Sequence, residues 1–238
     1  MKSLVLSSVF LALLPISSLQ AQVLPKEASD LTKHANAAVL QELPFTNRED
    51  FDDAHRGLIE ALPGGIIKTG EKVNWNLNRY DFLKQGVAPD TINPSLWRIA
   101  QLNLENGLFK VTDRVYQVRG FDLSNMTIIE GDTGLIIVDT LITTEVAKAA
   151  LNLYYQHRPK KPVVAVIFTH SHADHYGGVK GVISEADVMS GKVKLLAPEG
   201  FLEEAVSENI FAGNAMARRT LYQYGAFLPP SERGQVDA

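Results

Sequence analysis

The sequence predicts an α/β protein in which helices cover a layered sheet. From Leu108 onward, segments rich in β-branched residues alternate with segments of helical spacing, which is typical of this class. The 238-residue chain is 45% hydrophobic and 21% charged, so it can form a real core. It has no cysteine, which excludes disulfides, thiolate metal ligands and a catalytic cysteine. The net charge of −4 is mild, and no basic block indicates a nucleic-acid partner.

The first 21 residues have the pattern of a signal peptide. Lys2 supplies a positive start, "LVLSSVFLALLP" an apolar centre and "SSLQAQ" a cleavage site after Ala21. An N-terminal membrane helix is the alternative. The apolar stretch is short for a span of about 30 Å and contains a proline, so we expect no stable membrane anchor. We therefore expect an exported protein, periplasmic or secreted.

Residues 22–107 are predicted to form a helical or irregular N-terminal extension. "ASDLTKHANAAVLQEL" favours a helix capped by Ser29 or Asp30. "NREDFDDAHRGLIEAL" favours a second helix, with Asn47 as its cap and "PGG" as its stop. "NWNLNRYDFLKQG" and "PSLWRIAQLNLENG" look helical or irregular, and few β-rich runs occur in this region. We expect the extension to pack on the rest of the chain.

Residues 108–238 carry the strand signals of the predicted domain. One or two strands are expected in 108–120, and two more, joined by the turn "GDTG", in 125–140. A helix capped by Thr143 or Thr144 comes next. The remaining elements are expected in this order: a strand at 162–168, a partly helical segment at 179–191, a strand at 193–198, and helices at 199–213 and 215–225.

A group of polar donors follows the most apolar strand. The run from Val163 to Phe168 has no polar side chain, so we expect a strand buried on both faces. His170, His172, Asp174 and His175 come directly after it, where open α/β sheets place binding residues. The rigid strand would hold a tight loop that aims several donors at one place.

The type and spacing of these donors predict a metal site. Neutral imidazole and carboxylate are ligands that Zn²⁺ prefers, although iron or manganese would also suit them. His170 and His172 can face the same side of an extended segment, whereas the adjacent Asp174 and His175 diverge. The four donors therefore divide more naturally between two neighbouring metals than around one. Gly177 and Gly178 would allow a sharp backbone turn where a Cβ would crowd the site. The other histidines (His34, His55 and His157) have no neighbouring ligand set and are interpreted as ordinary surface or core residues.

The segment "THSHADHYGG" resembles the metallo-β-lactamase superfamily, whose motif is H-x-H-x-D-H followed by glycine. The upstream "GLIIVDT" supports the resemblance, because that family has an aspartate near a strand end, here Asp139. The implied fold is an αββα sandwich. More narrowly, "RVYQVRGFDLSNMTIIEGDTGLIIVDTL", "FTHSHADHYGGVKGV" and "ENIFAGNAMARR" resemble the exported bacterial alkyl sulfatases of this superfamily.

The resemblance implies an enzyme with two zinc ions that cleaves alkyl sulfate esters to alcohol and sulfate. His170 and His172 would bind one metal, and Asp174 and His175 the other. Asp174 could also act in catalysis by orienting the attacking hydroxide, although a simple ligand role is favoured. Family members are much longer and have further ligands downstream, so we expect an N-terminal part of the family's chain. Residues 108–238 would form only the first half of the sandwich, an incomplete domain, and the homodimer of the full-length family is doubtful here.

Three interpretations of function remain open. The first is the alkyl sulfatase, acting on a small-molecule sulfate ester. The second is another superfamily hydrolase, such as a lactonase, thioester hydrolase or β-lactamase. The third is an inactive chain with a partial metal site. Arg218, Arg219 and Asn214 could face a sulfate, and Phe211 an alkyl chain, but solvated helix charges and core packing are the favoured interpretations.

Overall fold

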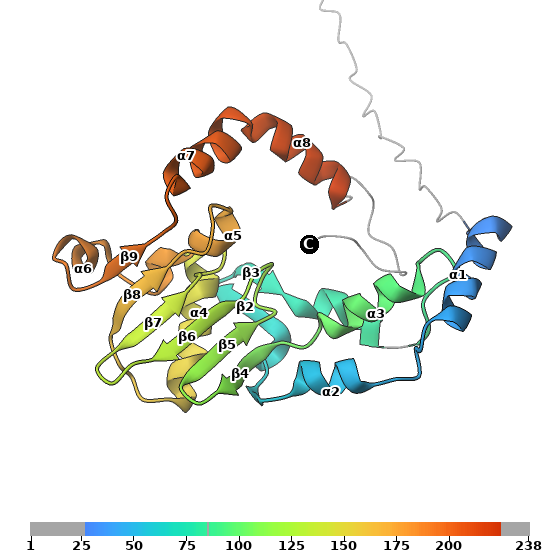
Figure 1. Ribbon diagram of the computed structural model, residues 1–238, viewed down its shortest axis with the longest axis horizontal. Coiled ribbons are helices and arrows are strands. Elements are labelled where there is room, and N and C mark those ends of the chain that lie inside the picture. Colours follow the sequence, from blue (N-terminus) through green and yellow to red (C-terminus); the bar gives the residue numbers. More distant parts are fainter. Residues whose placement is uncertain (1–26, 85, 225–238) are drawn as a thin grey trace, which may run out of the picture.

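The computed structural model describes residues 27–84 and 86–224, and its centre is a seven-stranded sheet (Figure 1). The strand order is β1-β4-β5-β6-β7-β8-β9. The strands are β1 (Leu58–Glu60), β4 (Gly107–Thr112), β5 (Val115–Arg119), β6 (Met126–Glu130), β7 (Leu135–Val138), β8 (Val163–Ile167) and β9 (Lys194–Leu196). Pairing is antiparallel from β1 to β7 and parallel from β7 to β9. This mixed sheet with covering helices confirms the predicted class.

Helix α4 (Thr144–His157) covers one face of the sheet and buries it. Thr143 caps the helix as predicted, because its side chain accepts a hydrogen bond from the Val146 N–H. The buried face consists of alternate residues of three strands: Tyr116, Val118, Met126, Ile128, Leu135 and Ile137. This single helix layer on one sheet agrees with the first half of an αββα sandwich.

The opposite face of the sheet is only partly covered by the described residues. Along β5, β6 and β7, buried and half-buried residues alternate, as expected for a sheet with one packed face. The prediction that the strand at 162–168 is buried on both faces is wrong. Val163 and Val166 are buried, whereas Val164 and Ile167 are half-buried.

The N-terminal extension contains the expected helices and three strands that the sequence pattern did not predict. The helices are α1 (Asp30–Glu42), α2 (Glu49–His55) and α3 (Pro94–Leu102), with the 3₁₀ segments η1 (Pro63–Gly65) and η2 (Leu77–Lys84). Ser29 caps α1 as predicted. Strand β1 joins the main sheet, while β2 (Ile66–Thr69) and β3 (Lys72–Asn76) form a hairpin that packs against α4. The extension is therefore structurally continuous with the main sheet.

The helix predicted over residues 47–62 ends at His55, much earlier than expected. Gly57 has a φ of +79°, which ends helical geometry, and the next residues form β1. A Cβ at Gly57 would lie 2.2 Å from the Lys110 carbonyl oxygen. The close approach of this backbone to β4 explains why glycine occupies the position.

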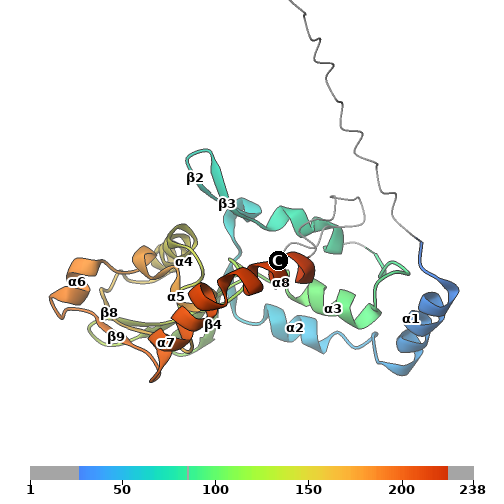
Figure 2. The same ribbon diagram turned by 90° about the horizontal axis from the view of Figure 1, so that it is seen from above.

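The chain after the histidines forms short helices and then an arm. The short segments are α5 (Ala173–Tyr176), η3 (Val179–Gly181) and α6 (Glu185–Met189). The arm follows β9 and consists of α7 (Phe201–Val206), the π-helix η4 (Ser207–Phe211) and α8 (Gly213–Gln223). It leaves the sheet edge and runs back toward the side of the molecule that carries α3 (Figures 1 and 2).

The expected signal peptide lies outside the described residues, as does the polar segment after Tyr224. Within residues 27–84 and 86–224, the structure has no helix that is both long enough and apolar enough to cross a membrane.

Candidate metal centre

The segment that carries His170, His172, Asp174 and His175 is called the histidine loop. It begins where β8 ends and continues through α5, as the sequence predicted. The buried Asp139, just after β7, fixes this loop through hydrogen bonds to Thr169 and His175. Its Oδ1 accepts the Thr169 N–H at 2.8 Å, and its Oδ2 accepts the Thr169 hydroxyl at 2.7 Å and lies 2.7 Å from His175 Nδ1. Asp139 has a φ of +57°, a left-handed geometry that aspartate tolerates better than most residues.

These hydrogen bonds define which ring nitrogens carry lone pairs. A carboxylate only accepts, so His175 donates from Nδ1 and keeps the lone pair of Nε2. The Thr169 hydroxyl donates its one hydrogen bond to Asp139. It therefore accepts a hydrogen bond from His170 Nδ1, 3.0 Å away. The lone pair of His170 is then also on Nε2. Both tautomers place the lone pair on Nε2, the nitrogen that would bind a metal, and in His170 this atom accepts a hydrogen bond from His172 Nδ1.

The four predicted ligands lie together as two pairs of donor atoms. His170 Nε2 is 3.0 Å from His172 Nδ1, and His175 Nε2 is 3.3 Å from Asp174 Oδ2. The rings of His170 and His175 are neighbours, with centroids 4.0 Å apart. Two ligands of one tetrahedral ion, each at about 2.0–2.1 Å, are themselves separated by about 3.3 Å. Each pair therefore suits two positions on one ion.

The described residues contain no group of three or more His, Asp or Glu side chains placed to hold a single metal ion. The paired arrangement agrees with this result, because each pair supplies two donors rather than three. A four-coordinate ion on either pair would need further donors or water. Donor chemistry and tautomers suit a metal, and the role of His170, His172, Asp174 and His175 as ligands stays a prediction.

Glu208 approaches the loop from the arm. Its Oε1 lies 3.6 Å from His172 Nε2, and its side chain is 29% exposed. Glu208 belongs to η4, and single-turn π-helices occur often at functional sites. The arm thus brings a carboxylate to the histidine on the side opposite His170.

The loop between β5 and β6 braces the histidine loop from a second side. The buried Asp122 accepts the Ser124 N–H at 2.9 Å and the Ile142 N–H at 2.8 Å. The Ser124 hydroxyl in turn donates to the Asp174 carbonyl at 2.5 Å. Burial raises the pKa of Asp122 to about 6, against the effect of the two backbone hydrogen bonds. The backbone of Asp174 is therefore fixed by contacts outside its own loop.

The two glycines after α5 pack where the sequence analysis expected crowding. A Cβ on Gly177 would lie 2.3 Å from the Ile142 carbonyl oxygen, and one on Gly178 would lie 2.1 Å from that of Thr140. Both glycines have ordinary negative φ values, so close packing explains them rather than an unusual turn. The histidine loop sits directly on the segment that follows β7.

The weaker candidates lie away from this centre or on exposed surface. Arg218, Arg219 and Asn214 are exposed on α8, as the favoured interpretation of solvated charges expected. The prediction that Phe211 packs in the core is wrong, because its side chain is 85% exposed at the end of η4. The remaining histidines each contact one other residue away from the histidine loop: His34 the Asp30 carbonyl, His55 the Glu105 side chain and His157 the Glu60 side chain.

Sequence reasoning did not identify Asp122, Ser124 or Glu208 as neighbours of the site. The pattern "DLS" is a weak signal, because an aspartate whose side chain accepts the N–H two residues later forms an Asx-turn. No local pattern marks Glu208, since only the fold of the arm brings it to His172.

The class defined by this fold and loop is confirmed by comparison with known families. The model of the metallo-beta-lactamase superfamily matches residues 119–237, which include strands β6 to β9 and the histidine loop. The chain belongs to the metallo-beta-lactamase superfamily.

Similar proteins within the superfamily are alkylsulfatases. The chain is 62% identical over 216 residues to a linear primary-alkylsulfatase of Pseudomonas sp., covering 90% of this chain and 32% of that protein. It is 57% identical over 213 residues to an (R)-specific secondary-alkylsulfatase of Pseudomonas sp., covering 90% and 32%. The solved structure of the stereoselective inverting sec-alkylsulfatase Pisa1 from Pseudomonas sp. matches with a TM-score of 0.81 and 57% identity, covering 89% and 33%. The chain thus spans about a third of the length of these relatives.

Proposed function

We propose that the chain is part of a metal-dependent sulfuric ester hydrolase that cleaves alkyl sulfate esters to an alcohol and sulfate. The observation that carries this proposal is the 62% identity to a protein named as a linear primary-alkylsulfatase, over a region that includes the whole histidine loop. The superfamily match alone would support hydrolases of several substrate classes. The high identity across the extension and the loop favours sulfate esters among them.

We further propose that the cofactor is a pair of zinc ions. His170 and His172 would hold one, and Asp174 and His175 the other, in keeping with the two donor pairs. Bound zinc would lower the pKa of a coordinated water and stabilise negative charge on the ester oxygens. The protein residues supply orientation: Asp139 fixes the tautomers of His170 and His175, and Ser124 holds the backbone of Asp174.

The first prediction concerns zinc content and sulfate release by the purified chain. We expect zinc to bind with two equivalents per chain at saturation, and sulfate to be released from a linear alkyl sulfate. The double variant H170A H172A should lose about one equivalent of zinc and all sulfate release. Metal is measured by mass spectrometry after dialysis, and sulfate by ion chromatography. The matched control is H34A, which removes an exposed histidine of α1 and should change neither result.

Other outcomes of this experiment favour the other two functions. Hydrolysis of a lactone or β-lactam without sulfate release would contradict the sulfatase proposal and favour another activity of the superfamily. Less than one zinc per chain without any turnover would favour a partial metal site. Equal zinc content in the wild type and in H170A H172A would contradict the proposed ligands.

We also propose that residues 1–21 direct export to the periplasm or beyond, as the sequence pattern indicates. Cell fractionation, followed by N-terminal sequencing of the mature protein, tests this proposal. A mature N-terminus at Gln22 in the exported fraction is expected, and a cytoplasmic protein that retains Met1 would contradict it.

A further inference from the structure

The arm begins beside the histidine loop and is anchored there by aromatic packing. Phe201, the first residue of α7, stacks on Phe168 just after β8, with ring centroids 5.5 Å apart and an angle of 20° between the ring planes. Its ring also lies edge-on to Tyr176 of α5, with centroids 5.4 Å apart. Phe168 precedes the predicted ligands in the chain, and Tyr176 follows them. The start of the arm is therefore fixed to both ends of the histidine loop.

The π-helix η4 continues from α7 and carries Glu208. Its turn is wider than that of an α-helix, because the Ala212 N–H donates to the Ser207 carbonyl, five residues earlier, at 2.9 Å. The side-chain amide of Asn209 donates to the Ala205 carbonyl at 2.9 Å, which ties the same turn back to α7. Glu208 thus approaches the histidine loop from a turn that is hydrogen-bonded on both sides of it.

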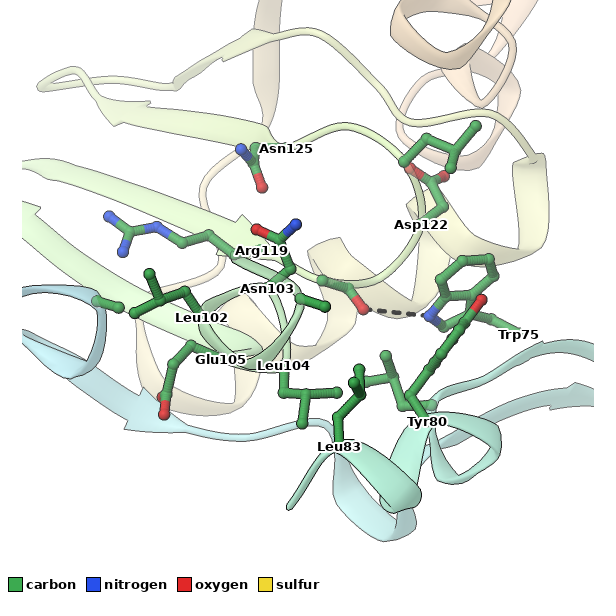
Figure 3. A pocket seen from close by; sticks show the side chains of 15 residues that line it. Trp75, Tyr80, Leu83, Leu102, Asn103, Leu104, Glu105, Arg119, Asp122 and Asn125 are labelled. Carbon is green, nitrogen blue, oxygen red and sulfur yellow. Dashed lines mark hydrogen bonds between the residues drawn. The ribbon is translucent and has the colours of Figure 1, made fainter. Parts of the chain in front are cut away.

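Two other carboxylates near the histidine loop are engaged elsewhere. Asp139 is shared between Thr169 and His175. Asp122 lies on the wall of a cavity of about 460 Å³ between the N-terminal extension and the loop that connects β5 with β6 (Figure 3). Each of its two oxygens accepts a backbone N–H. Glu208 on the arm instead faces a predicted metal ligand, His172.

The contact of Glu208 with His172 is an ion-pair distance that a small rotation could shorten. Glu208 Oε1 lies 3.6 Å from His172 Nε2, which is slightly too long for a direct hydrogen bond. The His172 side chain is 57% exposed, so its ring has room to turn toward the carboxylate. Within the described parts of the chain, no Lys or Arg forms an ion pair with Glu208. Its charge is therefore available to this imidazole.

The two nitrogens of His172 have different surroundings, which gives the carboxylate a role. Nδ1 lies 3.0 Å from His170 Nε2, where the tautomer of His170 places a lone pair. An ion held by these two nitrogens would take a lone pair from each, so a neutral His172 would then keep its proton on Nε2. Nε2 is the atom that faces Glu208. A histidine that binds a metal usually donates its other N–H to a carboxylate, carbonyl or water, and this partner fixes its tautomer.

We propose that Glu208 is a positioning residue of the metal centre. It accepts the Nε2 hydrogen of His172 and so directs Nδ1 toward the ion shared with His170. This inference rests on the metal pair proposed above and does not require hydrolysis of a sulfate ester. We do not assign Glu208 as a ligand, since the described residues contain no group of three His, Asp or Glu side chains placed to hold one ion. One side chain would thus link the arm to the metal centre.

Competition titrations of the full chain against a chromophoric zinc chelator test this role. Glu208→Ala should weaken the binding of one zinc ion about 10–100-fold and leave the other unchanged, because Glu208 contacts only one donor pair. Glu208→Gln keeps an acceptor oxygen without the charge, so its affinity should lie between those of Glu208→Ala and the wild type. The matched control, Glu203→Ala, removes an exposed carboxylate of α7 with the same change in net charge. It should bind both zinc ions as the wild type does.

Nitrogen NMR of the histidine rings in the zinc-loaded wild type measures the tautomer without depending on any variant. We expect His172 to bind zinc through Nδ1 and to carry its proton on Nε2. Glu208 should protect this proton from exchange with water, so its signal should broaden or vanish in Glu208→Ala. A purely structural role of Glu208 in the arm would leave the signal unchanged.

Specific results would overturn the proposal. Wild-type affinity for both zinc ions in Glu208→Ala would remove Glu208 from the metal centre and leave the proposed metal pair intact. Equal weakening in Glu203→Ala would assign the effect to net charge, and equal weakening of both zinc ions in Glu208→Ala would assign it to the fold of the arm. A proton on His172 Nδ1 in the zinc-loaded wild type would contradict the tautomer. A wild type that binds no zinc would contradict the metal pair itself, and the role of Glu208 with it.

Discussion

Asp139 organises the histidine loop because one carboxylate accepts hydrogen bonds from a backbone N–H, a hydroxyl and an imidazole. Its position after β7 follows from the sheet, since its own N–H donates to the Ile167 carbonyl of β8. The carboxylate therefore couples the ends of two parallel strands to the side chains that follow one of them. Loss of a carboxylate oxygen at this position should disturb the metal site more than the fold.

We predict that Asp139→Asn weakens zinc binding about 10–100-fold. Asparagine tolerates the positive φ, so the backbone should persist. Its amide replaces one acceptor with a donor, which opposes either the Thr169 N–H or the proton on His175 Nδ1. Zinc titration against a chelating indicator measures the effect.

Asp132→Asn is the control, because Asp132, in the turn after β6, is 90% exposed and pairs with Arg114 rather than with the histidine loop. It should bind zinc as the wild type does. Wild-type zinc affinity in Asp139→Asn would contradict the positioning role of Asp139.

Glu130 forms a buried polar cluster at the other end of β6, away from the metal centre. It is 7% exposed and accepts hydrogen bonds from Arg158 Nε, Arg158 Nη2 and the Tyr154 hydroxyl, at 2.7, 3.0 and 2.7 Å. The hydrogen bonds from Arg158 hold the pKa of Glu130 below its ordinary value of 4.5. A lowered carboxyl pKa means that the ionised form stabilises the folded state.

We predict that Glu130→Gln lowers the free energy of unfolding by about 1–3 kcal/mol at pH 7. The contribution of Glu130 is fully present above pH 4.5 and is lost as the pH falls through the lower folded-state pKa. The wild type should therefore lose more stability than Glu130→Gln over that acid range. Urea titrations at a series of pH values measure both. Glu185→Gln, at a side chain that is 80% exposed, should follow the wild type. Parallel pH profiles for wild type and Glu130→Gln would contradict this assignment.

The short helix α5 and the glycines after it bring the histidine loop into contact with the segment after β7. Gly178 donates its N–H to the Leu141 carbonyl, and Thr140 donates its N–H to the His175 carbonyl. Leu141 has a φ of +63°, so this segment adopts an unusual backbone to meet the loop. The packing leaves no room for a side chain at position 178.

We predict that Gly178→Ala destabilises the fold by about 1–3 kcal/mol or more, because the new Cβ would lie 2.1 Å from the Thr140 carbonyl oxygen and 2.8 Å from the Ala147 Cβ. Neither backbone can move without disturbing the contact between α4 and the loop. Gly213→Ala is the matched control, since a Cβ there would meet no atom within 4 Å and the residue begins α8. It should be neutral or stabilising by about 0.5–1 kcal/mol. Thermal unfolding measures both variants. Equal melting temperatures of Gly178→Ala and the wild type would contradict the close packing at position 178.

Elements with local signals could be predicted from the sequence, and those that depend on distant partners could not. The caps Ser29 and Thr143 and the turn between β6 and β7 are encoded in a few adjacent residues. Strand β1 has only three residues and exists because β4 pairs with it, far along the chain. The site follows the same rule. Its predicted ligands are close in sequence, whereas Ser124 and Glu208 reach them only through folding.

The extension and the main sheet form one continuous structure through contacts of three kinds. Strand β1 pairs with β4, the hairpin β2–β3 packs on α4, and His157 Nε2 at the end of α4 lies 2.5 Å from Glu60 Oε2. Ile67 of the hairpin is 6% exposed and belongs to the same core cluster as α4. From these contacts we expect the parts on either side of the predicted boundary at residue 107 to unfold together.

We predict that the described chain unfolds in a single transition. Both tryptophans, Trp75 and Trp97, lie in the extension, so fluorescence reports on that part, whereas far-UV circular dichroism also reports on α4 and the sheet. In urea the two signals should give the same midpoint. Ile67→Ala should cost about 2–5 kcal/mol and move both midpoints equally, because the cavity it leaves lies between hairpin and helix. The exposed Val73→Ala, in the same hairpin, should move neither. A fluorescence midpoint below the circular dichroism midpoint would contradict the prediction, as would a shift of the fluorescence midpoint alone in Ile67→Ala. Either result would show that the extension unfolds independently and that its contacts with α4 contribute little to the stability of the sheet.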